Sequence, residues 1–246
     1  MKNRLLTLIL ISAFALQFAV AEAAQTKTLK LTEKNIDKIV AAMTLEEKAN
    51  IVVGMSRSLT DAETANIGYT KKIVPGAAGT TYPIPRLGVT PMVFADGPAG
   101  VRISTTRKGV DRKFYCTGFP VGTLLSSTWN DALVETVGNA LGEEAKEYGV
   151  DVLLAPGLNI MRNPLCGRNF EYYSEDPLLT GKIAAAYVRG VQSEGVGTSI
   201  KHYAVNNQEI NRLANDSRLS ERALREIYLK GFEIAVKESD PWTVMT

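Results

Sequence analysis

The sequence is poor in the residues that build metal centres and disulfide frameworks. Its 246 residues contain one histidine, His202, and two cysteines, Cys116 and Cys166. A single histidine argues against a zinc site built on imidazoles, and a Ser-His-Asp triad could form only around His202. We therefore expect no metal and no other cofactor. The cysteines fall in expected loops and leave two alternatives open, one disulfide or two separate thiols.

The chain also lacks an excess of charge of either sign. It carries 28 lysines and arginines against 26 aspartates and glutamates, for a net charge of +2. This balance argues against nucleic acid as a partner and against capture by an anionic membrane. Its hydrophobic content of 45% and charged content of 22% are typical of a globular protein. We expect any binding site to accept a neutral ligand.

Long apolar runs are missing except at the start of the chain. Lys2 and Arg4 precede an apolar segment at 5–20, and small residues at 19–24 suit a signal peptidase. We expect residues 1–24 to be a signal peptide and the protein to be secreted or periplasmic. An uncleaved anchor is the alternative, disfavoured by the small-residue end. No other segment has the roughly 20 apolar residues that span a bilayer, so we expect no membrane contact after cleavage.

The rest of the chain alternates between strand and helix patterns. Short apolar runs predict strands at 92–95, 121–125, 150–155, 198–200 and 242–246. Capped, one-faced apolar patterns predict helices at 130–149, 177–192 and 220–237. A capping box at 44–47 predicts that the first helix begins near Leu45, and 56–88 is expected to be loop without a domain boundary. Alternating strands and long helices indicate an α/β fold with a parallel sheet.

Polar side chains follow three of these predicted strands. They include Asp96 after the first strand, a loop at 162–177 rich in charged and aromatic residues, and the Lys201-His202 pair. Loops at the carboxyl ends of parallel strands are where α/β proteins bind ligands. Carboxylates accept hydrogen bonds from hydroxyl groups, whereas lysine and arginine donate to hydroxyl oxygens. This combination predicts a site for an uncharged polyol ring, that is, a sugar.

Each of these residues also has a purely structural interpretation. Asp96, before Gly-Pro, could only shape a turn, and Lys201 with His202 could be a partly buried pair. Arg212 could be a surface charge, and the arginines and glutamates of the 162–177 loop could pair only with each other. The site interpretation is favoured because the groups are expected to converge at one edge of the sheet.

Four ordered motifs resemble glycoside hydrolase family 3 of the β-glucosidase type. They are Phe-Ala-Asp-Gly-Pro-Ala-Gly-Val-Arg at 94–102, Arg-Asn-Pro-Leu-Cys-Gly-Arg-Asn-Phe-Glu-Tyr-Tyr-Ser-Glu-Asp-Pro at 162–177, Lys-His-Tyr-Ala-Val-Asn-Asn-Gln-Glu at 201–209 and Trp-Thr-Val-Met-Thr at 242–246. The resemblance spans roughly residues 38–246. It implies a (β/α)8 barrel of the TIM type, here incomplete with about five of eight βα units, over residues 25–246.

The resemblance also implies roles for individual residues. It implies that Asp96 grips the distal hydroxyl groups of a terminal glucose and that Arg168, Lys201 and His202 are further sugar ligands. It places Arg102, Arg212 and Met245 at the same pocket, and it gives Glu171, Glu175 and Asp176 a structural role.

Subtype and completeness can be argued from the same motifs. Residues 204–208 replace the His-Asp loop of members that act on N-acetylglucosamine, and Asp96-Gly97-Pro98 differs from the xylosidase-type motif. A β-glucosidase that releases terminal, non-reducing glucose with retention is therefore expected. The alternatives are a β-xylosidase-type member or a non-catalytic, truncated sugar binder. The resemblance places the nucleophilic aspartate beyond Thr246 and the acid/base glutamate in a second domain, which would complete the site.

Because both catalytic carboxylates are expected outside residues 1–246, we predict that the isolated chain hydrolyses no aryl β-glucoside detectably. The measurement is release of the aryl alcohol above a buffer blank. Turnover that disappears in the Asp96→Ala variant would contradict the prediction.

Overall fold

The computed structural model describes residues 29–56 and 73–246. The predicted signal peptide at 1–24 lies outside these residues. The described residues divide into two compact units, one of residues 29–53 with 82–91, the other of residues 54–56 and 73–81 with 92–246. In the described ranges, no helix is both long and apolar enough to span a membrane.

The smaller unit contains two short helices, α2 (Ile36–Ala42) and α3 (Leu45–Val53), and a 3-10 turn, η1 (Pro85–Leu87). The predicted capping box is confirmed, because the Glu47 amide donates to Thr44 Oγ1 at 3.1 Å and the Thr44 amide donates to Glu47 Oε2 at 2.9 Å. The helix predicted to begin near Leu45 is confirmed as α3, but it is not the first helix, because α2 precedes it. A small apolar core of this unit is formed by Ile39, Ile84, Leu87 and Val89.

The larger unit is built on a six-stranded sheet with strands in sequence order. The strands are β1 (Met55–Ser56), β2 (Gly79–Thr80), β3 (Val93–Asp96), β4 (Val152–Leu154), β5 (Gly197–Lys201) and β6 (Thr243–Met245). The first two strands pair antiparallel, and β3 to β6 are all parallel neighbours. The predicted α/β fold with a parallel sheet is thus confirmed, and the sheet curls as part of a barrel would.

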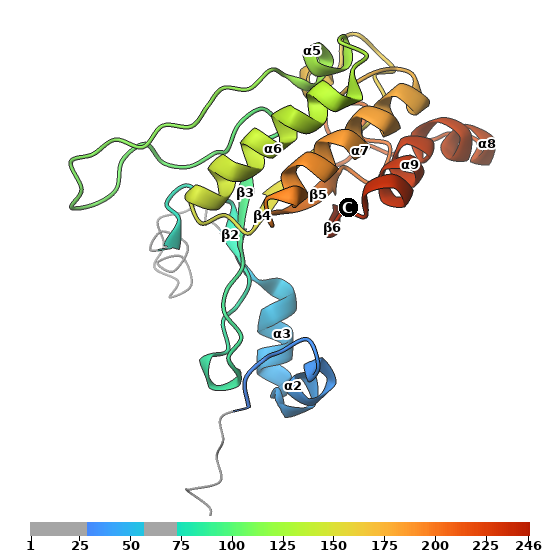
Figure 1. The fold of residues 1–246 in the computed structure, drawn as a ribbon. Coiled ribbons are helices and arrows are strands. Elements are labelled where there is room, and N and C mark those ends of the chain that lie inside the picture. Colours follow the sequence, from blue (N-terminus) through green and yellow to red (C-terminus); the bar gives the residue numbers. More distant parts are fainter. Residues whose placement is uncertain (1–28, 57–72) are drawn as a thin grey trace, which may run out of the picture. The chain divides into compact units, whose positions relative to one another are not determined.

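Three long helices lie side by side on one face of this sheet (Figure 1). They are α6 (Asp131–Glu147), α7 (Pro177–Ser193) and α9 (Lys230–Ser239). The predicted N-caps are present, since Asn130 Oδ1 accepts from the Leu133 amide at 3.0 Å and Asp176 Oδ1 accepts from the Leu178 amide at 2.7 Å. The main core lies between these helices and the sheet.

Glycines allow α6 and α7 to pack closely. A Cβ atom added at Gly190 would lie 2.1 Å from the carbonyl oxygen of Glu135, and one at Gly138 would lie 2.6 Å from the carbonyl oxygen of Tyr187. Both contacts are with backbone atoms, which cannot rotate away. The two helices therefore approach each other more closely than any larger residue at these positions would permit.

The strand predicted at 121–125 is wrong, because Gly122–Ser126 form a short helix, α5. The helix is fixed by contacts with a distant loop. Thr123 Oγ1 donates to the carbonyl oxygen of Asn169 at 3.0 Å, and Ser126 Oγ donates to that of Tyr173. These tertiary bonds override a weak local apolar pattern. The described residues consequently contain four parallel strands rather than the five that were predicted.

Two other predicted segments also differ from the structure. The helix predicted at 220–237 is divided into α8 (Glu221–Ala223), a π-helical turn η3 (Leu224–Tyr228) and α9. The segment expected to be loop at 56–88 includes β2 and η1, and residues 57–72 lie outside the described residues. The short elements were missed because two-residue strands have no recognisable period.

We predict that Gly190→Ala lowers the free energy of unfolding by about 1–3 kcal/mol, because the added methyl group overpacks the α6–α7 contact. Alanine is intrinsically the better helix former by about 1 kcal/mol, so any loss must come from packing. Urea unfolding followed by circular dichroism measures the change.

Gly118→Ala is the matched control, since no atom lies within 4 Å of a Cβ added there. We expect this control to change stability by less than about 0.5 kcal/mol. Equal stability of the Gly190→Ala variant and the unmodified chain would contradict the close-packing argument.

Candidate functional site

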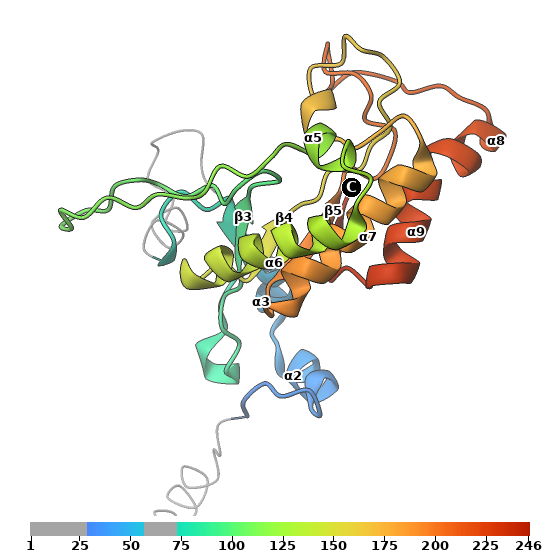
Figure 2. The same ribbon diagram turned by 45° about the horizontal axis from the view of Figure 1, so that its top comes forward.

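The carboxyl ends of the parallel strands bring polar residues together at one edge of the sheet. Asp96 is the last residue of β3, Lys201 the last of β5 and Met245 the last of β6. Side chains alternate along a strand, so Asp96 and Lys201 point away from the helix-covered face, where Ala95 and Ile200 join the core. The loops after β4 and β5 rise at this same end (Figure 2).

A buried lysine at the end of β5 faces an aspartate at the end of β3, with β4 between the two strands. The Lys201 Nζ atom lies 3.5 Å from Asp96 Oδ1, and only 4% of the lysine side chain is exposed. Arg102 approaches the other carboxylate oxygen at 3.9 Å from the solvent side. Burial lowers the pKa of Lys201, and the neighbouring Asp96 carboxylate partly opposes this effect. The pair therefore combines a charged donor with a carboxylate that retains exposed oxygen for a ligand.

The loop after β4 holds Arg168 in place through Glu171. The guanidinium contacts the carboxylate directly, and Glu171 belongs to a short 3-10 turn, η2 (Asn169–Glu171). The loop is further braced internally, because Asn169 Nδ2 donates to the Asn163 carbonyl oxygen at 2.7 Å. Arg168 can therefore pair with Glu171 and still contact a ligand, since its side chain remains 21% exposed.

His202 is held on the sheet edge by Asn159, a residue that is 2% exposed. The His202 amide donates to Asn159 Oδ1 at 2.8 Å, and Asn159 Nδ2 donates to the His202 carbonyl oxygen at 2.9 Å. Burial, followed by the charges of Arg168, Lys201 and Arg212, lowers the pKa of His202 from 6.5 to about 3. The imidazole is therefore neutral throughout the physiological pH range.

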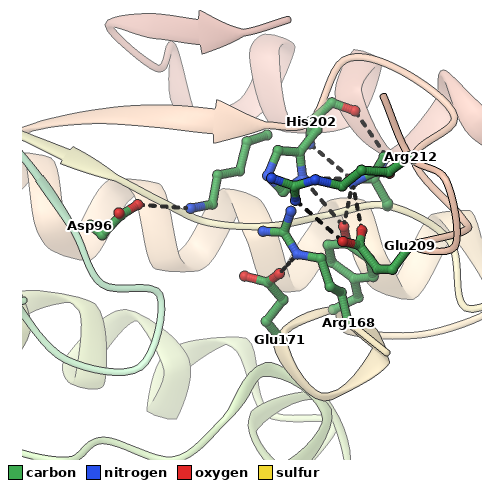
Figure 3. A network of polar contacts seen from close by, with 10 residues as sticks. Asp96, Arg168, Glu171, His202, Glu209 and Arg212 are labelled. Carbon is green, nitrogen blue, oxygen red and sulfur yellow. Dashed lines mark hydrogen bonds and ion pairs between the residues drawn. The ribbon is translucent and has the colours of Figure 1, made fainter. Parts of the chain in front are cut away.

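Arg212 lies in the loop after β5, beside His202 and Glu209 (Figure 3). Its Nη1 atom lies 3.2 Å from Glu209 Oε2, and 54% of its side chain is exposed. Asn206 Nδ2 lies 3.4 Å from Glu209 Oε1 and 3.4 Å from the Tyr172 hydroxyl group. The loop after β5 thus orients Arg212 through Glu209, as the loop after β4 orients Arg168 through Glu171.

A single pocket of about 580 Å³ collects every residue that was predicted for the site. Those lining residues are Asp96, Arg102, Arg168, Lys201, His202, Arg212 and Met245. The pocket is also lined by residues that were not predicted as ligands, namely Pro98, Phe170, Glu171, Asn206 and Leu213. Most of these belong to the same motifs, so proximity in sequence to the predicted ligands was the available signal. The anchoring function of Asn159 had no such signal.

The pocket is equipped to hold an uncharged, hydroxyl-rich ligand. Its four cationic side chains can donate hydrogen bonds, while the Asp96 carboxylate and the neutral imidazole of His202 can accept them. Among residues 29–56 and 73–246, no cluster of three or more histidines, cysteines or carboxylates could hold a metal ion. Cys116 and Cys166, for which a disulfide was one alternative, are both free thiols.

Comparison with known proteins identifies the family. Residues 99–246 match the model described as the glycosyl hydrolase family 3 N terminal domain. The chain belongs to glycosyl hydrolase family 3. The predicted resemblance to this family is thereby confirmed.

Three family 3 relatives show how the similarity is distributed. The thermostable beta-glucosidase B of Acetivibrio thermocellus is 44% identical over 214 residues, which are 86% of this chain and 26% of that protein. Beta-glucosidase 3B of Thermotoga neapolitana, solved in complex with alpha-D-glucose, is 56% identical with a TM-score of 0.78, covering 85% of this chain and 28% of that one. An exo-alpha-(1->6)-L-arabinopyranosidase of Bifidobacterium longum is 44% identical over 84% of this chain and 25% of that protein. The chain therefore spans about a quarter of the length of these relatives.

We predict that His202 makes folding sensitive to acid in one pH window. Its pKa is about 3 in the folded chain against 6.5 for the free side chain, so the unfolded state binds the extra proton. The contribution of His202 to the free energy of unfolding is complete above about pH 6.5. It is lost as the pH falls towards about 3, by up to about 1.4 kcal/mol per pH unit.

Denaturant unfolding at about pH 7.5 and about pH 4.5 measures this effect. The control is His202→Gln, which removes the only histidine of the chain and leaves all other titrating groups in place. The unmodified chain should lose more stability than the variant between the two pH values. An identical loss in both would contradict the prediction.

Proposed function

We propose that the protein to which this chain belongs hydrolyses terminal, non-reducing β-D-glucosyl residues, and that residues 92–246 bind the glucose. The observation that carries the proposal is the pocket in which the Asp96 carboxylate meets buried Lys201 and the neutral His202. The glucose complex of the Thermotoga neapolitana relative supports this choice of ligand. Asp96 is proposed to accept hydrogen bonds from two sugar hydroxyl groups while Lys201 and Arg168 donate to sugar oxygens.

The two catalytic carboxylates are proposed to come from outside residues 1–246. Retaining glycosidases need a nucleophile and an acid/base carboxyl group about 5–5.5 Å apart across the glycosidic bond. Neither carboxylate that lines the pocket suits these tasks, because Asp96 is shared between Lys201 and Arg102 and Glu171 is only 8% exposed and paired with Arg168. We therefore assign no catalytic role to any carboxylate of this chain, and we propose that a second domain completes the site.

We propose that the sheet is part of a (β/α)8 barrel in the longer protein. The parallel order of β3 to β6, with helices on one face, is the arrangement such a barrel requires. Strand β6 is the last strand of the sheet, and Val244 within it is 44% exposed. A groove of about 610 Å³ with mostly apolar walls lies between β6 and α9. A further βα unit packed there would cover both the strand edge and this groove.

We also propose that residues 1–24 direct secretion and that the mature domain begins near residue 25. The proposal rests on the basic start, the apolar segment and the small residues of the sequence. N-terminal sequencing of the secreted protein tests it.

A second candidate activity is suggested by the Bifidobacterium longum relative, whose name specifies an α-L-arabinopyranoside. Arabinopyranose lacks the hydroxymethyl group of glucose and differs in the configuration of one ring hydroxyl group. Asp96 is therefore the residue expected to discriminate the two sugars, because it is proposed to contact the hydroxyl groups far from the cleaved bond. Xylose, which also lacks the hydroxymethyl group, tests the β-xylosidase alternative in the same way.

We predict that the chain binds glucose weakly and that Asp96→Asn reduces the affinity by about tenfold or more, because a charge-assisted hydrogen bond contributes about 1.5–3 kcal/mol. Titrations with D-glucose, L-arabinose and D-xylose, followed by NMR, measure both affinity and preference.

The matched control is Asp111→Asn, since Asp111 is exposed and forms no ion pair within the described part of the chain. The control should bind like the unmodified chain. Tighter binding of arabinose than of glucose would favour the second candidate activity. Equal glucose affinity of the Asp96→Asn and Asp111→Asn variants would contradict the role of Asp96.

A further inference from the structure

We infer that Asn159 is a positioning residue that fixes His202 as the Nδ1–H tautomer, so that the Nε2 lone pair accepts a hydrogen bond from a sugar hydroxyl group. The identity of the ligand rests on the proposed function. The tautomer itself rests only on contacts within the chain and can be measured without a sugar.

The backbone of His202 determines which way the Asn159 amide faces. The His202 amide can only donate, and it lies 2.8 Å from Asn159 Oδ1. The His202 carbonyl oxygen can only accept, and it lies 2.9 Å from Asn159 Nδ2. Rotating the Asn159 amide by half a turn would place donor against donor and acceptor against acceptor. The position of the amide oxygen is therefore set by chemistry that does not depend on the imidazole.

The same amide oxygen lies 3.2 Å from the Nδ1 atom of the His202 ring. An amide oxygen carries no hydrogen, so this contact is favourable only if Nδ1 carries the proton. An unprotonated Nδ1 would instead face the oxygen with two lone pairs opposed. Because Asn159 is 2% exposed, no bulk water is available to relieve that repulsion.

The Tyr172 hydroxyl group is the only other group within hydrogen-bonding distance of Nδ1 in the described part of the chain, at 3.3 Å. It could donate to an unprotonated Nδ1, which would favour the opposite tautomer. However, a hydroxyl group can rotate and act as an acceptor, whereas the Asn159 oxygen cannot donate. The Nδ1–H tautomer thus opposes neither neighbour, because the Asn159 oxygen accepts and the Tyr172 hydroxyl group can turn its hydrogen away, whereas the Nε2–H tautomer leaves the Asn159 contact repulsive.

This tautomer supplies an acceptor in a pocket dominated by donors. The positive charges that act on the ring are those of Arg168, Lys201 and Arg212. Arg212 lies beside the ring, with Glu209 next to it (Figure 3). These cations disfavour protonation of both ring nitrogens at once, and together with burial they keep the ring neutral. A sugar hydroxyl group both donates and accepts, so its hydrogen needs an acceptor such as Nε2.

The single histidine of the chain makes the test direct. The chain is labelled with ¹⁵N-histidine, purified with a histidine-free tag and recorded by long-range ¹H–¹⁵N correlation at neutral pH. We expect a protonated Nδ1 and an unprotonated Nε2. A protonated Nε2, with either a bare or a protonated Nδ1, would overturn the inference.

Asn159→Asp makes the effect of residue 159 on the imidazole dependent on pH, and it also removes the amide that donates to the His202 carbonyl oxygen. The carboxylate still accepts from Nδ1–H, and its charge is expected to raise the pKa of His202, so the ring becomes protonated and Nε2 becomes a donor. Glucose affinity of this variant should fall by about tenfold at low pH and recover as the pH rises through the new pKa, whereas the unmodified chain shows no such profile. A variant whose affinity is lowered equally at every pH would overturn the positioning role.

Asn163→Asp is the matched control, because it adds the same charge to the same loop. In the unmodified chain, Asn163 Oδ1 accepts from the Leu165 amide at 2.9 Å, and an aspartate oxygen can still do so. It should leave the tautomer and the pH profile unchanged. If the chain binds no sugar but His202 is the Nδ1–H tautomer, the proposed function fails while the assignment to Asn159 stands. If sugar binds and Nε2 is protonated, the assignment to Asn159 fails while the proposed function stands.

Discussion

The ion pair between Lys201 and Asp96 is the constraint on which the site depends. An ammonium group that is almost fully buried needs a counter-charge. The Asp96 carboxylate lies 3.5 Å away on β3, which is separated from the Lys201 strand, β5, by β4. The pair can form only if β3, β4 and β5 are parallel and in their observed register, in which Lys201 extends two residues beyond the level of Asp96. The fold and the pocket are in this way determined by the same strand alignment.

The helices contribute by making that alignment rigid. The close contact of α6 with α7, permitted by Gly138 and Gly190, fixes two βα units relative to each other. The loop that carries Arg168 connects β4 to α7, so its two ends are attached to this rigid pair. Hydrogen bonds from α5 to the same loop brace it from a third element. A loop held at three points can present a guanidinium group at a defined position.

Features with local causes were predictable from the sequence, whereas those with tertiary causes were not. The caps at Asn130 and Asp176 and the apolar patterns of α6 and α7 depend on residues a few positions apart. By contrast, α5 depends on hydroxyl bonds to residues about 47 positions away, and its short apolar pattern resembles a strand. Six of the seven predicted pocket residues lie within the four motifs and Arg212 follows three positions after one of them, and the strand ends explain why those motifs converge. Asn159 stayed unassigned because its partner lies 43 positions away and no motif marks an anchoring amide.

The electrostatics of the pocket are consistent with a site completed by other parts of a longer protein. The lining residues include four cations, Arg102, Arg168, Lys201 and Arg212, but only two carboxylates, Asp96 and Glu171, and the adjacent Glu209 leaves an excess of one positive charge. A neutral sugar would not balance that local excess of positive charge. The nucleophile and the acid/base group of a retaining glycosidase are both carboxyl groups, and at least the nucleophile must be ionised when it attacks. A cationic pocket favours the ionised form of a carboxylate brought close to it. On the proposed function, the surplus of arginine and lysine is thus the part of the catalytic electrostatics that this chain supplies.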